Sequence, residues 1–179
     1  NGTSRIAEVV STLDPKNANL IVNVQADEPQ IDPGVIDELV EGLESDPEAP
    51  MATLASEFAV DEDPNDPNIV KLVVSDKEGC CRALYFSRSI IPYDRDRRGI
   101  KPLKHPGVYV YRREFLLEYV TLSPTPLEQI EQLEQLRALE HGYPIAVIKT
   151  VVRHHGIDTP KQYEAFVQHY LNATGHESH

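Results

Sequence analysis

A buried-strand pattern near the start of the chain, set between two helical patterns, most constrains the fold. Residues 20–24 are apolar except for Asn23, and a continuous apolar run of this kind is typical of a strand covered on both faces in a parallel sheet. Residues 3–13 before it and the segment opening at Pro33-Gly34 after it carry apolar side chains at helical spacing. The order helix–strand–helix predicts an α/β domain.

The middle of the chain reads as short strands. Strands are predicted at residues 51–56, 69–75, 80–86 and 107–111, with a hairpin turn at 76–79. Segments 60–68 and 92–106 are rich in charged residues, Asp and Pro, and are predicted to be loops.

A long helix is predicted from Thr125 to His141. Thr125 and Glu128 match a capping box, Pro126 suits the first helical position, and Gly142 is a good C-terminal stop. A last strand at 145–152 and a final helix from Thr159-Pro160 to about residue 171 follow. The whole pattern predicts one domain over residues 1–179, with a three-layer fold and a mixed, mostly parallel sheet.

Composition excludes several classes of protein. The net charge of −12 argues against binding a nucleic-acid polymer, and no apolar run approaches the roughly 20 residues that a membrane span needs. Cys80 and Cys81 are adjacent, which is poor geometry for a disulfide or a zinc site, and free thiols suit a reducing cytoplasm. The first residue is Asn1, so we interpret the chain as a piece of a longer protein.

Two aspartates lie where ligands bind in α/β sheets, beyond the carboxyl ends of strands. Asp27 follows the apolar run, and Asp158 follows the last predicted strand. Carboxylates in such positions hold Mg²⁺ against substrate phosphates. The alternatives are a solvated turn at Asp27 and an ordinary polar helix entry at Asp158.

The long predicted helix carries an acid among apolar positions. Glu134 falls between Leu127, Ile130 and Ala138. A carboxylate there needs a partner, which is Arg137 at i+3 on the simpler interpretation and a sugar hydroxyl on the other. The leucines recur every three residues and spiral around the helix, so we expect it to be covered on two sides, the second by another subunit.

A further candidate set is basic and aromatic, and Arg88 in it could bind a substrate carboxylate through two hydrogen bonds. Its members are Arg88, His105, Tyr109 and Tyr111. The pair His154-His155 would point to opposite faces of a strand, which disfavours a dedicated metal site there. All nine glycines are isolated, so the sequence contains no glycine-rich phosphate loop.

Six segments, taken in order, resemble the CMP-KDO synthetases (3-deoxy-manno-octulosonate cytidylyltransferases). The segments are N-G-T-S-R-I-A-E-V-V, N-V-Q-A-D-E-P, A-L-Y-F-S-R-S-I-I-P-Y-D-R-D, H-P-G-V-Y-V-Y-R, S-P-T-P-L-E-Q-I-E-Q-L-E-Q-L-R and G-I-D-T-P. Their order and spacing agree with the family from residue 1 to about residue 166.

The resemblance implies a fold, a reaction and a set of site residues. The fold would be Rossmann-like, of the nucleotide-diphospho-sugar transferase type, and the enzyme a cytoplasmic homodimer. It would transfer CMP from CTP to 3-deoxy-manno-octulosonate (KDO) with Mg²⁺, for lipopolysaccharide synthesis. Asp27 and Asp158 would hold the metal and act in catalysis with Arg88. Gln25, Arg88, His105, Tyr109, Glu134 and Gln135 would surround the sugar acid, and Gly2, Thr3 and Arg5 would lie near the cytidine.

The chain also departs from the family pattern. It lacks the first strand and the basic loop that grips the triphosphate, so the expected domain is incomplete at its N-terminus. Ala26 replaces a glycine, and Ser4 replaces an acid. These departures leave two alternatives open, namely a non-catalytic remnant of the family and a cytidylyltransferase for another sugar acid.

Overall fold

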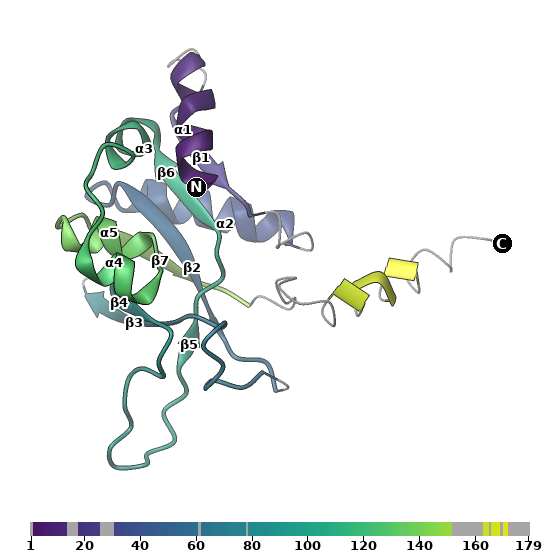
Figure 1. Ribbon diagram of the computed structural model, residues 1–179. Helices are drawn as coiled ribbons and strands as arrows, with labels where there is room; N and C mark the ends of the chain where they lie inside the picture. The colour runs from purple at the N-terminus through teal and green to yellow at the C-terminus, as the bar shows by residue number, and fades with distance from the viewer. Residues whose placement is uncertain are drawn as a thin grey trace.

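The computed structural model describes residues 2–13, 18–25, 31–60, 62–77, 79–151, 163–164, 166–168 and 170–171. Figure 1 shows the arrangement of its elements. The helices are α1 Gly2–Thr12, α2 Pro33–Ser45, α3 Arg113–Tyr119, α4 Pro126–Glu131 and α5 Gln135–Glu140. The strands are β1 Leu20–Asn23, β2 Met51–Glu57, β3 Lys71–Lys77, β4 Cys80–Ser87, β5 Leu103–Lys104, β6 Tyr109–Arg112 and β7 Ile145–Lys149.

All seven strands belong to one sheet organised around β2. One edge of β2 pairs with β6 and then with β5, and its other edge pairs with β7. Because β7 also pairs with β4, the strands β2, β5, β3, β4 and β7 close into a small barrel. Beyond this barrel, β6 carries β1 at its outer edge.

The sheet is mixed, as predicted, but the prediction that it is mostly parallel was wrong for the described strands. Among them only the β2–β7 pairing is parallel. The apolar run at β1, read as a parallel strand, pairs antiparallel with β6, from Leu20 opposite Arg112 to Asn23 opposite Tyr109. An apolar run indicates burial, and burial alone does not fix the direction of the neighbouring strand.

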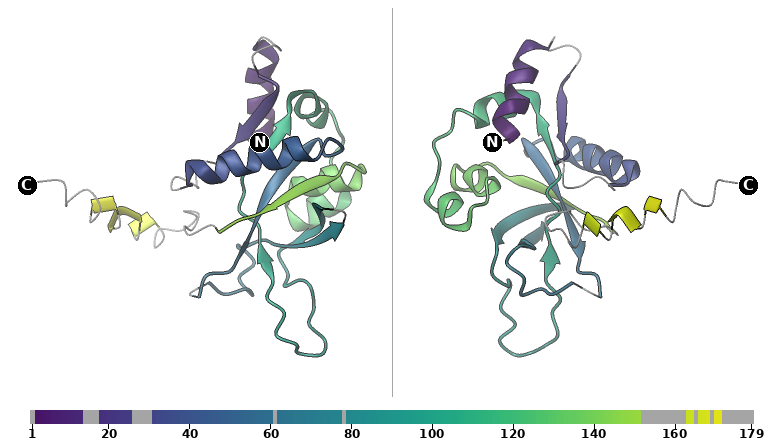
Figure 2. Two further views of the ribbon diagram at one scale, coloured as in Figure 1. Left: turned by 180° about the vertical axis from the view of Figure 1, so that it is seen from behind. Right: turned by 45° about the vertical axis from the view of Figure 1, so that its right-hand side comes forward.

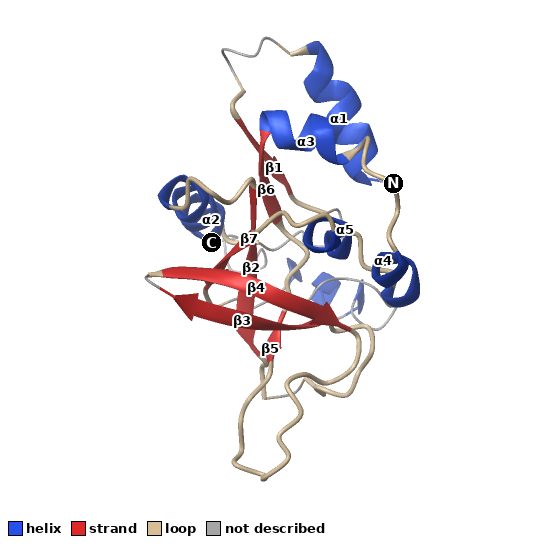
Figure 3. Ribbon diagram, turned by 90° about the vertical axis from the view of Figure 1, so that its left-hand side faces the viewer, coloured by secondary structure: helices blue, strands red, loops and turns tan. Residues whose placement is uncertain are grey.

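Alternation along the central strands produces two apolar faces, each covered by helices. Ala52, Val110 and Ala146 face α2, which packs there through Val35, Leu39 and Leu43. Met51, Tyr111 and Ile145 face the opposite core with α1, α3 and α5. Figures 2 and 3 show α2 apart from these other helices. The approach of α2 to β7 is close, since a Cβ added at Gly42 would lie 2.3 Å from Cγ1 of Ile148.

The single long helix predicted from Thr125 to His141 is wrong, because the segment forms two short helices. Gln132 adopts a left-handed backbone conformation with φ 54° and ψ 48°, and this corner separates α4 from α5. A straight helix would spiral its leucines around the axis, whereas the corner turns Leu133 and Leu136 into one core. The predicted start is confirmed, with the Thr125 backbone N–H donating to the Glu128 carboxylate at 3.2 Å.

The remaining predicted elements agree with the structure to within a few residues. The hairpin at 76–79 joins β3 to β4, and Gly79 has the positive φ that the turn needs. The sequence patterns did not indicate β5 or α3. Residues 163–171 are helical where described, and the predicted start at Thr159-Pro160 lies outside the described residues. No helix in the described part of the chain is long and apolar enough to cross a membrane.

Candidate functional site at the break between β5 and β6

The strand that runs along one edge of β2 is interrupted at residues 105–108. Pro106 has no backbone N–H for a sheet ladder, and Val108 N–H donates to the Pro106 carbonyl at 2.8 Å across Gly107. Thr53 of β2 fills the gap by donating its hydroxyl proton to the Val108 carbonyl at 2.7 Å. The Gln25 side chain covers the break from above, since a Cβ at Gly107 would lie 3.5 Å from its amide.

His105 enters this break as a neutral imidazole. Its Nε2 lies 2.9 Å from the Thr53 hydroxyl oxygen, and because that hydroxyl donates to Val108, Nε2 carries the proton between them. The ring packs against Phe86 and Tyr109, with centroids 4.9 and 5.4 Å away. Burial lowers the pKa of His105 to about 3, although part of the residue reaches the surface.

Three tyrosines continue the site from His105 toward the helices. Tyr109 and Tyr111 stack with centroids 5.9 Å apart, and Tyr119 of α3 lies 6.4 Å beyond Tyr111. Burial raises the pKa of each phenol, and the neighbouring Glu134 carboxylate adds to the increase. The phenols therefore remain neutral hydrogen-bonding groups across the physiological pH range.

The start of the described chain meets the corner between α4 and α5 at Glu134. The Thr3 hydroxyl at the start of α1 donates to Glu134 Oε2 at 2.8 Å, and Tyr119 OH donates to the Glu134 carbonyl at 2.6 Å. Next to it, Gln135 is buried at 5% exposure, and its Nε2 has no hydrogen-bond partner among the described residues. A buried amide donor without a partner is costly, so it is well suited to a ligand oxygen.

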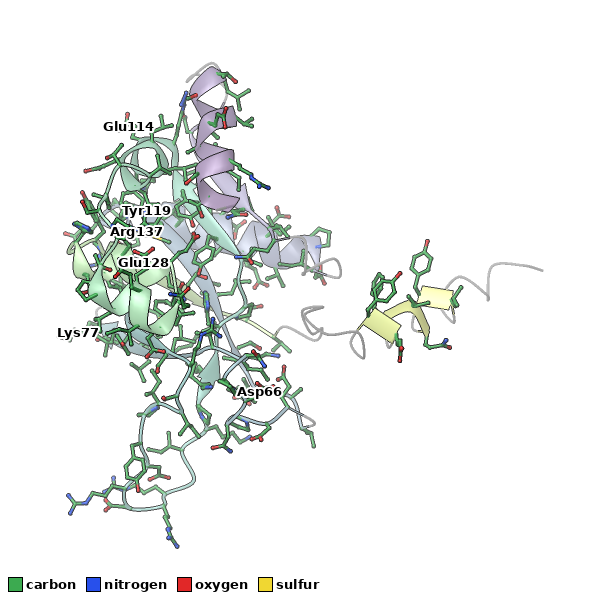
Figure 4. The ribbon with its side chains drawn as sticks, viewed as in Figure 1. Asp66, Lys77, Glu114, Tyr119, Glu128 and Arg137 are labelled. Carbon is green, nitrogen blue, oxygen red and sulfur yellow. The ribbon has the colours of Figure 1, made fainter. Side chains whose placement is uncertain are left out.

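The prediction that Arg137 pairs with Glu134 is wrong. Arg137 Nε donates instead to Glu128 Oε2 at 2.8 Å, and its guanidinium lies 5.1 Å from the centroid of the Tyr119 ring. Figure 4 shows Tyr119, Arg137 and Glu128 one below another, from α3, α5 and α4. Burial raises the pKa of Glu128 and the Arg137 hydrogen bond lowers it, with a lowered pKa as the result. The Glu134 carboxylate therefore accepts from Thr3 and not from Arg137.

Arg88 lies at the same corner, but its guanidinium is occupied by main-chain carbonyls. Nε donates to the Glu131 carbonyl at 2.8 Å, and Nη1 donates to the Pro67 carbonyl at 2.9 Å. Nη2 reaches the Gln132 carbonyl at 3.4 Å. Its role toward a substrate carboxylate remains a prediction.

The structure thus brings together six of the predicted site residues and leaves others apart or undescribed. Thr3, Gln25, His105, Tyr109 and Glu134 form one continuous face, with Gln135 beside it. Gly2 and Arg5 lie on exposed positions of α1. Asp27 and Asp158 lie outside the described residues, as do His154 and His155.

Sequence reasoning did not single out Thr53, Tyr119 or Lys71. Lys71 did carry a signal, because it is a charged residue within the apolar run I-V-K-L-V-V. Thr53 gave none, since a threonine in a strand is ordinary. Tyr119 belongs to a helix that the pattern did not indicate.

Comparison with known proteins places this α/β chain among the nucleotidyltransferases. The family model described as Cytidylyltransferase matches residues 1–163, so the chain belongs to the cytidylyltransferase family. Within that family its similarity is to the 3-deoxy-manno-octulosonate cytidylyltransferases. It is 51% identical to that of Solibacter usitatus over 168 residues, covering 92% of this chain and 63% of the relative. It is 46% identical to that of Syntrophobacter fumaroxidans, covering 93% of this chain and 66% of the relative.

A solved structure agrees with these relatives. The structure of CMP:2-keto-3-deoxy-manno-octonic acid synthetase complexed with CTP matches with a TM-score of 0.86 and 37% identity, covering 97% of this chain and 69% of that chain. The chain therefore spans roughly two thirds of the length of the proteins that it matches, from 63% to 69% in these comparisons.

Proposed function

We propose that this chain carries the sugar-acid site of an enzyme that transfers CMP from CTP to KDO and releases pyrophosphate. The anomeric oxygen of KDO would form a bond to the α-phosphorus, while the bond from that phosphorus to the oxygen bridging to the β-phosphate breaks. The observation that carries the proposal is the hydrogen bond between Thr3 and Glu134, residues 131 positions apart. It joins the motif expected near cytidine to the motif expected near the sugar.

The chemistry of the described face suits a polyhydroxylated acid. Glu134 is the charged acceptor at its centre, and neutral donors and acceptors surround it, from Gln25, His105, Tyr109 and Gln135. Such groups orient sugar hydroxyls through hydrogen bonds, and a buried donor without a partner discriminates strongly for a ligand that pairs with it. Thr3 with Gly2 and Arg5 would lie toward the cytidine, and Arg88 would act at the sugar's carboxylate.

We further propose that Asp27 and Asp158 hold Mg²⁺. Within the described residues no group of three or more His, Cys, Asp or Glu side chains could hold a metal ion. Gln25, the first residue of the Q-A-D-E-P motif, packs over the break at Gly107, which supports the assignment of this motif to the site. Mg²⁺ bound there would supply neutralisation of charge on the phosphates.

The finer features of the fold and assembly are proposals as well. We propose a three-layer, Rossmann-like arrangement for the fold. We also propose that the enzyme acts in the cytoplasm and serves lipopolysaccharide synthesis. A homodimer is supported by Ile130 of α4, which is 77% exposed. It is also supported by residues 88–102, which we call the arm. The arm contains several arginines, whereas the whole chain has a net charge of −12.

The test is pyrophosphate release with CTP, KDO and Mg²⁺, compared among wild type, Asp27→Asn and Asp37→Asn. Asp37 is an exposed acid on α2 and provides a matched control. We expect Asp27→Asn to lose release and Asp37→Asn to keep it. Release that is equal in all three variants would contradict the assignment of Asp27. Absence of release from the wild type, together with absence of KDO binding, would favour a non-catalytic remnant.

A further inference from the structure

The corner between α4 and α5 presents Glu134 and Gln135, and its backbone is held in an unfavourable conformation. Gln132 has φ 54°, in the left-handed region that is sterically unfavourable for a residue with a side chain. Such conformations persist where surrounding contacts over-determine them. Within the corner, Leu133 N–H donates to the Glu128 carbonyl at 3.2 Å, and the Gln132 amide donates to the Gln129 carbonyl at 2.7 Å.

A buried lysine lies behind this corner. Lys71, the first residue of β3, is 0% exposed. Its ammonium donates to the carbonyls of Asp66 at 3.0 Å and Ile69 at 2.8 Å, and to the carbonyl of Arg88. An ammonium has three donors, and here each has a main-chain acceptor. A buried charge is tolerated only with such complete pairing, so Lys71 ties the loop before β3 to the residue that follows β4.

Arg88 carries this connection onward to the corner. Its carbonyl accepts from Lys71, while its guanidinium donates to the carbonyls of Glu131 and Gln132, the last residue of α4 and the left-handed residue. The Glu131 carboxylate closes the connection by accepting from Arg88 N–H at 3.0 Å and from the Ser87 hydroxyl at 2.7 Å. Both ends of Arg88 are therefore held, one by β3 and one by α4.

We propose that Lys71 is a positioning residue for the sugar-acid site, acting through Arg88 to hold the corner that presents Glu134 and Gln135. Three observations carry the inference: the complete burial of Lys71, its bond to the Arg88 carbonyl, and the bonds of the Arg88 guanidinium on either side of the left-handed residue. Only the consequence for the sugar acid rests on the proposed function.

The first test measures the corner itself, by amide hydrogen exchange in the 179-residue chain with Lys71→Met. We expect exchange at Leu133, Leu136 and Arg137 to rise about tenfold more than exchange in β2 and β7, because loss of the network opens a local unit rather than the whole fold. Lys149→Met is the matched control, since Lys149 pairs with Asp76 at an exposed site. Equal increases in exchange at the corner and in β2 would mean that Lys71 stabilises the whole fold and not the corner in particular. This result would overturn the proposal.

A second comparison tests the route through Arg88. If Lys71 acts through Arg88, the double variant Lys71→Met with Arg88→Lys should open the corner no more than the stronger single variant does, because both changes break one connection. Additive effects would contradict this route. Should Lys71→Met fail to fold, Ser87→Ala removes the hydroxyl bond to Glu131, together with the acceptor of the Ser89 backbone N–H. It should still raise exchange at the corner in preference to β2.

The last measurement determines how Lys71→Met changes the binding of KDO and CTP. With Lys71→Met we expect the Kd for KDO to rise about tenfold while the Kd for CTP changes less than about twofold, since the corner presents the sugar-binding side chains. Parallel losses for both ligands would contradict a positioning role. Failure of the wild type to bind KDO would refute the proposed function, and the exchange result would still decide whether Lys71 holds the corner.

Discussion

His105 illustrates how local environment sets chemical character. The residue was selected from the sequence as a candidate ligand for the sugar acid, and the structure adds that Thr53 fixes its tautomer. It is enclosed by Phe86 and Tyr109, and burial lowers its pKa to about 3. A neutral imidazole presents one fixed donor and one acceptor, which suits recognition of a hydroxyl group.

His105 should make the stability of the fold depend on pH. The unfolded state binds a proton at this histidine below pH 6.5, whereas the folded state binds it only near pH 3. The free energy of unfolding should therefore fall as the pH drops from about 6.5 toward about 3, with a slope of up to about 1.4 kcal/mol per pH unit. Urea unfolding of wild type and His105→Gln across this range measures the difference, and the exposed His141→Gln is the control. Parallel curves for wild type and His105→Gln would refute the assignment.

Thr3 gives a second prediction for a single residue. Thr3→Val preserves shape but leaves Glu134 Oε2 without its donor, so the free energy of unfolding should fall by about 1–2 kcal/mol. Thr3→Ser should retain most of the stability because it keeps the hydroxyl. Thr12→Val, at an exposed position on the same helix, should have little effect. Chemical denaturation of the four proteins makes the comparison, and equal losses for Val at both positions would contradict it.

Residue types and motif order were enough to select most of the described face, because polar groups in strand-end motifs are visible in a linear sequence. Pairings were not. Arg137 at i+3 from Glu134 is the natural partner on a straight helix, but the left-handed residue Gln132 changes which side chains meet. Lys71 likewise finds its acceptors on segments that only the tertiary fold brings to it.

At the scale of elements, the corner at Gln132 is the main difference between the predicted and observed structures. Capping signals located the start at Thr125 and the stop at Gly142, both of which the structure confirms. From Leu127 to His141 the sequence contains no glycine or proline, and a glutamine at the corner gives no local signal. Tertiary contacts from Arg88 to the two carbonyls there outweigh the helical preference of the segment.

The corner leads to a prediction that compares two substitutions. Gln132→Gly should be more stable than Gln132→Ala by about 1 kcal/mol, because only glycine occupies the left-handed region without steric cost. In the middle of a continuous helix the order would be reversed, with alanine favoured by a similar amount. Thermal and urea unfolding of both variants measure the order of stability. Greater stability of the alanine variant would contradict the left-handed conformation at residue 132.

At the scale of the whole molecule, the class of fold followed from the sequence but strand direction did not. Mixed helices and strands were correctly predicted, whereas the excess of antiparallel pairing depends on which segments meet, as with β1 and β6. The closure of the barrel through β7 depends on segments far apart in the chain. Such long-range choices leave little trace in local periodicity.

The arm gives a prediction for the assembly. Tyr93 near its tip is 83% exposed, and Asp94 holds the tip by accepting from the backbone N–H groups of Arg98 and Gly99. If the arm contacts a second acidic copy, Tyr93→Glu with Arg95→Glu should shift the chain toward monomer through lost burial and added repulsion. Sedimentation velocity at several concentrations measures the shift. Ser45→Glu with Lys77→Glu, at exposed positions outside the arm, makes the same change of net charge and is the control. Equal dissociation in both variants would contradict the arm as the contact.

The central place of β2 also has a consequence for synthesis of the chain. Its residues Met51–Glu57 leave the ribosome long before their partners in β6, β5 and β7, the last of which ends at Lys149. At the usual pace of translation the interval is on the order of ten seconds. During that time the mostly apolar β2 segment has no strand partner at either edge. Such a segment is prone to misassembly with other nascent chains. Production in cells should therefore depend more on chaperones that shield early segments than the stability of the finished barrel would suggest.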